Sequence, residues 1–107
     1  STFYVQNSDY HNKLWFQKSV EYYNKPIKLD TLYDRKKFVC MACMIPAVAY
    51  PYVTGKYTTK QKTAEWMAKE YPASAPWLIE LLERRNDSNY ENLDGLVKQT
   101  VEVLKLI

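Results

Sequence analysis

Few residues of this chain belong to the types that usually carry out chemistry. There is one Cys-x-x-Cys pair, Cys40 and Cys43, and a single histidine, His11, which we expect on the surface. A structural zinc site needs about four ligands, so these three side chains do not complete one. The sequence has no glycine-rich phosphate loop, no metalloprotease or serine-hydrolase motif, and no Asp-x-Asp pair for two Mg²⁺ ions. We therefore expect neither a metal site nor a self-sufficient enzyme.

The two cysteines are better explained by packing than by reactivity. Their neighbours, including Val39, Met41 and Ala42, are apolar, and the βαβ setting of a thioredoxin-like redox motif is not apparent. We interpret Cys40 and Cys43 as reduced thiols inside a buried helix. Free thiols fit a reducing, cytoplasmic location.

Aromatic residues are the richer signal, with ten Tyr and three Trp. Tyr50, Tyr52 and Tyr57 cluster around Gly55. Aromatic walls with a few polar groups line small-molecule clefts, although tyrosines also fill the rim of a small core. The charge is uneven, with a net charge of +6 for residues 1–62 and −3 for residues 63–107. Either a phosphate-facing surface or an uneven solvated surface explains this split.

The hydrophobic pattern predicts an all-α fold, a bundle of about five helices with short connections. Residues 1–10 are expected to form an extended lead-in. Pro46 lies inside the central segment, which either kinks there or forms two helices. The expected helices are residues 11–24, 32 to the Thr54-Gly55 turn, 58 to 71, 77–85 and 93–107. Their expected caps are Asp30, Thr58 with Gln61, Ser74, and Ser88 with Glu91.

Length and composition indicate one globular domain over residues 1–107. Hydrophobic residues make up 47% and charged residues 25%, which is ordinary globular usage. No apolar run approaches the roughly 18 residues of a membrane span, since the longest, residues 38–52, is interrupted by Pro46 and Pro51. No signal-peptide pattern is present. We therefore expect no membrane contact.

Residues 52–72 contain a glycine turn, a capped helix with a tryptophan, and a stop at Pro72. This order resembles the C-terminal helical domain of aminoglycoside nucleotidyltransferases, the streptomycin/spectinomycin adenylyltransferase kind. The resemblance covers about half of the chain well and residues 30–52 loosely. The matching positions are Thr54-Gly55-Lys56, Lys60, Ala64-Glu65-Trp66-Met67 and Tyr71-Pro72.

The resemblance implies a substrate-binding domain that forms the C-terminal part of a longer antibiotic-resistance enzyme. The complete enzyme would transfer a nucleotide from ATP, with Mg²⁺, to a hydroxyl of a cationic, aminoglycoside-like molecule. This domain would bind no cofactor by itself and would be inactive without its partner, the catalytic nucleotidyltransferase domain.

The resemblance also assigns site residues. Asp34 would meet the drug and could act as general base, and Lys60 with Lys56 would bind the nucleotide phosphates. Tyr33, Tyr57 and Trp66 would bind the substrate. We expect one concave face near Tyr33, Asp34, Tyr57 and Lys60, and an exposed apolar patch where the missing domain docks.

Two other functions stay open. A stand-alone helical module for protein interaction or regulation would be a closed monomer or a symmetric dimer with no anionic-ligand site. Nucleic-acid binding would use the basic and aromatic residues interleaved over residues 25–37, but no recognition-helix pattern accompanies them. Its affinity would fall steeply with salt.

Overall fold

The computed structural model describes residues 2–107, with side chains from Asp9 onward. All regular secondary structure in these residues is helical, which confirms the all-α prediction. The elements are α1 (Thr2–Asn24), α2 (Leu32–Ala42), α3 (Ile45–Thr54), α4 (Lys60–Glu70), the 3₁₀ turn η1 (Pro72–Ser74), α5 (Ala75–Asn86) and α6 (Asp94–Leu106).

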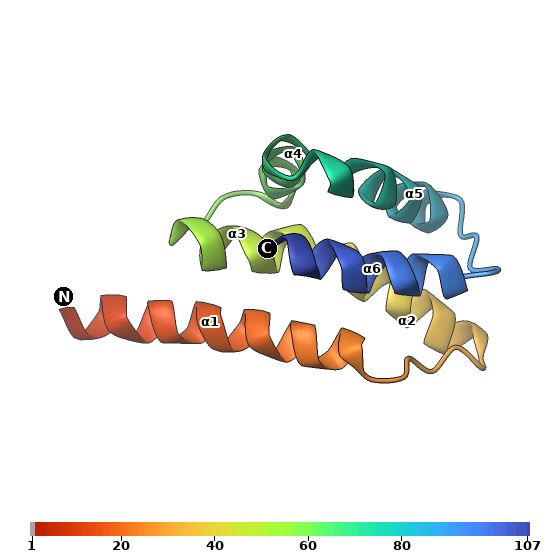
Figure 1. Ribbon diagram of the computed structural model, residues 1–107, viewed down its shortest axis with the longest axis horizontal. Coiled ribbons are helices and arrows are strands. Elements are labelled where there is room, and N and C mark those ends of the chain that lie inside the picture. The colour runs from red at the N-terminus through yellow and green to blue at the C-terminus, as the bar shows by residue number, and fades with distance from the viewer. Residues whose placement is uncertain (1) are drawn as a thin grey trace.

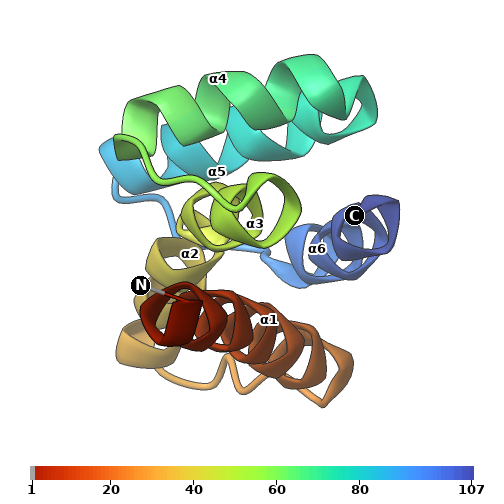
Figure 2. The same ribbon diagram turned by 90° about the vertical axis from the view of Figure 1, so that its left-hand side faces the viewer.

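The helices form three layers. Helix α1 lies along one side, α2, α3 and α6 occupy the middle, and α4 and α5 cover the other side (Figure 1 and Figure 2). Helix α1 contacts α3 and α6, while α4 contacts α3 and α5 contacts α2 and α6. The middle layer is therefore covered from both sides and carries most of the core.

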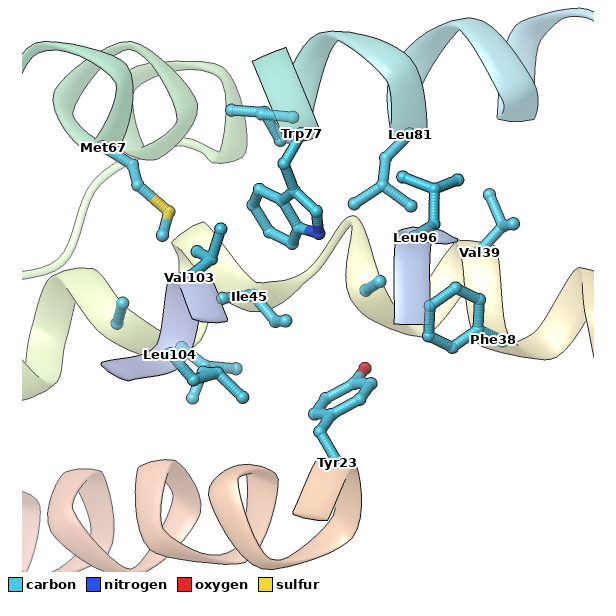
Figure 3. Close-up of a cluster of buried hydrophobic side chains, with 14 of the residues drawn as sticks. Tyr23, Phe38, Val39, Ile45, Met67, Trp77, Leu81, Leu96, Val103 and Leu104 are labelled. Carbon is cyan, nitrogen blue, oxygen red and sulfur yellow. The ribbon is translucent and has the colours of Figure 1, made fainter. Parts of the chain in front are cut away.

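The core fills the space between the layers. Tyr23 of α1 points toward Phe38 of α2, and Trp77 of α5 points from the opposite side toward Ile45 and Val103 (Figure 3). Each helix contributes apolar residues at the spacing of one helical face. Further buried hydrophobic residues are Phe16, Val39, Ala42, Val48, Ala49, Met67, Leu78, Leu81, Tyr90, Leu93, Leu96 and Leu104.

The predicted central helix is divided into α2 and α3. Pro46 is the second residue of α3, where its missing N–H is one that a helix start leaves without an intrahelical partner. Between the two helices, the amide of Met44 donates to the carbonyl of Met41, three residues earlier, in a tighter turn than that of an α-helix. When α2 and α3 are counted as the two halves of the predicted central helix, the described residues form the predicted five-helix bundle.

Helix α3 contains Pro51 and ends at the expected Thr54-Gly55 turn. Helix α3 continues through this buried proline to Thr54. Gly55 then ends it with φ of 70°, in the left-handed region, and donates its amide to the carbonyl of Pro51. Glycine adopts this conformation without the steric cost that a Cβ brings.

Two glycines allow the same substitution to be compared. No heavy atom would come within 4 Å of a Cβ added at Gly55 or at Gly95. Gly55→Ala is expected to lower the free energy of unfolding by about 1–2 kcal/mol, because of the left-handed backbone. Gly95→Ala, in α6, should raise it by up to about 1 kcal/mol. Urea denaturation measures both, and equal signs would contradict the assigned Gly55 conformation.

The extended lead-in expected over residues 1–10 is wrong. Helix α1 begins at Thr2, and Ser1 lies outside the described residues. No Pro or Gly occurs in residues 2–24. Once a helix exists, each added residue gains one hydrogen bond for one fixed residue, so nothing stops extension toward the N-terminus.

Two expected N-caps are displaced by one residue. Thr31 rather than Asp30 caps α2, and Thr59 rather than Thr58 caps α4. In both cases the threonine hydroxyl accepts a hydrogen bond from the amide three residues later. A capping side chain lies immediately beside the expected one, so the local sequence leaves the choice open.

The other two expected caps do not act as caps. Ser74 precedes α5, but its hydroxyl donates to the carbonyl of Tyr71 at 2.7 Å. Ser88 starts no helix, because α6 begins only at Asp94. The intervening segment folds back over the end of α5, and Tyr90 anchors it by inserting into the core.

One segment is more membrane-like than we expected. Residues Leu32–Thr54 are long and apolar enough, by length and composition, to cross a membrane, and 44% of the apolar window is buried inside the bundle. The segment consists of α2 and α3, which contact other helices from both outer layers. A helix pair that packs against other helices on both sides is apolar around most of its circumference, which is the composition found here.

Candidate functional site

An apolar groove lies between α1 and the α2–α3 pair, and a hollow of similar volume lies between the start of α5 and α6. The volume of the groove is about 350 Å³. It is lined by Trp15, Lys18, Ser19, Tyr22 and Tyr23 of α1, by Met41 and Met44 at the junction of the two middle helices, and by Ile45 and Val48 of α3.

A second hollow of about 210 Å³ continues this groove toward the N-terminal half of α1. His11, Leu14, Trp15 and Lys18 line it. Trp15 and Lys18 border both hollows, so the two form one strip along residues 11–23, which we call the α1 groove. At a rise of 1.5 Å per residue the strip is roughly 18 Å long.

The α1 groove exists because α1 carries apolar residues on more than one face. Phe16 and Tyr23 face the core. Trp15 and Tyr22 each precede one of them by one residue, which turns their side chains about 100° around the helix. Trp15 is 41% exposed, and Met41 on the opposite wall is 37% exposed. Aromatic and thioether surface that the fold leaves open is typical of a binding site.

Tyr23 forms the buried end of the groove. Burial raises the pKa of its hydroxyl well above the ordinary value, and the neighbouring Tyr22 and Cys43 contribute in the same direction. The rings of Tyr22 and Tyr23 meet edge to face with centroids 5.0 Å apart. The hydroxyl therefore stays neutral and acts neither as a base nor as an anion.

The residues expected to share one concave face are not brought together. Asp34 and Tyr33 lie at the start of α2, whereas Tyr57 follows the end of α3 and Lys60 begins α4. The start of α2 and the end of α3 are the two opposite ends of the α2–α3 pair (Figure 1). Twenty helical residues between these places span roughly 30 Å. The prediction of a single cleft formed by these four residues is therefore wrong.

Asp34 has a structural role in the α2 capping box. Its carboxylate accepts a hydrogen bond from the Thr31 amide at 3.2 Å. Desolvation alone would raise the pKa of Asp34, but hydrogen bonds from the Thr31 amide and hydroxyl, with the charge of Lys28, outweigh it and hold the pKa below its ordinary value. A carboxyl held ionised in this way is a weak general base.

The capping box should make stability depend on pH. A carboxyl whose pKa is lowered by folding stabilises the protein above its unfolded pKa of about 3.9, and this is lost as the pH falls through the folded pKa. Asp34→Asn should therefore lower the thermal midpoint at neutral pH, and the difference should shrink as the pH falls through the folded pKa of Asp34. Equal midpoints for both proteins at every pH would show that the box contributes nothing.

The tyrosines around Gly55 belong to the rim of the core. Tyr52 stacks on Phe16 with ring centroids 4.1 Å apart. The hydroxyl of Tyr57 donates to the buried Asn12 at 2.8 Å, although its ring is exposed. Tyr50 packs against Trp66. These contacts favour the packing interpretation of the cluster over a small-molecule cleft.

Trp66 and the two lysines lie apart from the described hollows. Trp66 is half-buried between Tyr50 and Tyr71, both edge-on to it. Lys56 lies within the loop of residues 55–59 and Lys60 directly follows it, and both are exposed. None of the three lines the α1 groove.

The cysteines form neither a disulfide nor part of a metal cluster within the described residues. Both are half-buried rather than fully buried. Burial raises the pKa of Cys43, against a smaller opposite effect of Arg85. A thiol that resists ionisation is a poor nucleophile, which favours the packing role.

The residues that line the α1 groove were not predicted from the sequence to form a binding site. Leu14, Trp15 and Phe16 are consecutive and large, and three consecutive helical side chains cannot all face one core. That run was the available signal. The second wall, with Met41 and Met44, comes from another helix, and only the packing of α1 on α3 places it opposite Trp15.

Comparison of the chain with family models, curated proteins and solved structures finds no match. None of these comparisons supports the resemblance to aminoglycoside nucleotidyltransferases, which stays a prediction from the sequence. A function must therefore be argued from the geometry of the α1 groove.

Proposed function

We propose that this protein is a helical interaction module that binds an amphipathic helix of a partner protein along the α1 groove. The observation that carries the proposal is the pair of open apolar walls, Trp15 on one side and Met41 on the other. Burying such side chains contributes roughly 25 cal/mol for each Å² of apolar area removed from water.

The dimensions of the groove suit a helix. Its length of roughly 18 Å corresponds to about 12 helical residues. Helices bind grooves through apolar residues one turn apart, and the two adjoining hollows offer places for two such residues. Methionine side chains such as Met41 and Met44 adapt their shape to a partner.

A cytoplasmic location agrees with this proposal. Cys40 and Cys43 are free thiols, and thiols stay reduced in the cytoplasm. The partner would then be another protein of that compartment.

A selection experiment tests the proposal. A display library of helical peptides of about 14 residues, with random apolar faces, is selected for binding to the protein. Backbone amide shifts of the protein then map the site. We expect the largest changes at Trp15, Lys18, Tyr22 and Met41. Changes centred on another surface, or a library without binders, would refute the proposed function.

The nucleotidyltransferase function is a second proposal, and the observation in its favour is the exposure of Lys56 and Lys60 around one turn. It predicts that Mg-ATP or an aminoglycoside raises the thermal midpoint, since a ligand at about 100 times its Kd adds roughly 2.7 kcal/mol of stability. The interaction module predicts no shift with either compound. The separation of Asp34 from Lys60 makes it the weaker proposal.

A further inference from the structure

We infer that the partner helix carries an acidic residue that pairs with Lys18, beside two apolar residues that fill the two hollows of the α1 groove. This inference rests on the proposed function and specifies the chemistry of its partner.

Lys18 occupies the middle of the groove. It lines both hollows, and it is the only side chain with a fixed charge among the described lining residues. No carboxylate of the described residues forms an ion pair with it, although Glu21 follows three residues later. Its ammonium group is therefore available to a partner that covers the strip.

The lining of the groove contains no carboxylate, and a further lysine lies nearby. Lys37 lies one helical turn before Met41 on α2, toward the same side. Of the nearby carboxylates, Asp9 pairs with Lys13 at 3.3 Å, Asp34 accepts a hydrogen bond in the α2 capping box, and Glu21 is exposed on α1 outside the lining of the groove. An approaching acidic side chain thus meets complementary charge, and a basic one meets repulsion.

The spacing of the hollows sets the pattern of the partner. The α1 residues that line the two hollows are centred about five residues apart, which is roughly 7 Å along the helix. Positions i and i+4 of a bound helix, about 6 Å apart along its axis, match this separation. Lys18 lies toward the exposed side of the strip, so the acidic residue belongs at the flank of the apolar face, at about i+1 or i+3.

Three designed peptides and two protein variants test the inference. Each helical peptide has about 14 residues with Trp and Leu four positions apart, and its flank carries Glu, Gln or Lys. We expect the Glu peptide to bind about tenfold more tightly than the Lys peptide at low salt, with a smaller difference at high salt. Lys18→Glu should reverse the order, while Lys98→Glu, on the exposed side of α6, should leave it unchanged. Circular dichroism checks that both variants stay folded.

The outcomes separate the inference from the proposed function. If all three peptides bind in the α1 groove with equal affinity, the acidic partner is refuted and the helix-binding function stands. If Lys98→Glu changes the order of affinities as much as Lys18→Glu, the net charge of the protein and not the position of Lys18 decides the affinity, and the inference is refuted. If no peptide shifts the amides of the groove, both are refuted.

Discussion

Trp77→Ala is expected to lower the free energy of unfolding by about 3–5 kcal/mol, the usual cost of removing a large buried aromatic side chain. Trp77 is 2% exposed, and it points from α5 into the space between the layers (Figure 3). Its indole N–H donates to the hydroxyl of Thr100 at 2.8 Å, and that hydroxyl donates to the carbonyl of Leu96 at 2.7 Å. The substitution removes both the packing and one buried hydrogen bond.

Urea denaturation followed by circular dichroism measures this loss, and a neighbouring residue provides the control. Ile79, two positions along α5, is 56% exposed, so Ile79→Ala should change stability by no more than about 0.5 kcal/mol. Thr100→Val should cost about 1–3 kcal/mol, because it leaves the indole N–H without its partner. A loss below about 1 kcal/mol for Trp77→Ala would contradict its central position in the core.

Tyr23→Phe is expected to remove a large loss of stability at alkaline pH. The unfolded chain ionises this tyrosine near pH 10, whereas burial keeps it neutral in the folded protein to higher pH. The folded state therefore binds more protons above pH 10, and stability falls by about 1.4 kcal/mol for each pH unit until the folded pKa is reached. Below pH 10 this contribution is constant.

The alkaline prediction has a matched control among the other tyrosines. Tyr33 is 73% exposed, so Tyr33→Phe should leave the decline with pH unchanged. The measurement is the free energy of unfolding between about pH 9 and pH 12 for the original protein and both variants. If Tyr23→Phe and Tyr33→Phe behave alike, Tyr23 is not the group that resists ionisation.

Much of the fold could be predicted because helical periodicity and proline positions are local properties. The apolar residues of α6 recur with the period of one helical face, and the bundle follows from several such segments joined by short loops. Boundaries were less predictable. Asp30 and Thr31, like Thr58 and Thr59, are adjacent capping residues, and tertiary packing decides between them.

The candidate site was harder to predict because it depends on distances between elements. Asp34 and Lys60 were expected together, but Asp34 lies at the start of α2 whereas Lys60 begins α4, beyond the far end of α3. Trp15 and Met41, which no local motif connects, lie on facing walls of one groove because α1 packs along α3. Such a pairing is set by packing and not by either segment alone.

The most direct test of the account is the affinity of a groove-binding helical peptide for variants of the two walls. Trp15→Ala and Met41→Ala should each weaken binding, and Trp15→Ala should do so about 30-fold or more, which corresponds to the roughly 2 kcal/mol of an interface hot spot. Ile79→Ala, which removes an even more exposed apolar side chain from α5, should leave the affinity unchanged. An unchanged affinity for both wall variants, or an equal loss with Ile79→Ala, would contradict the assignment of the α1 groove as the partner site.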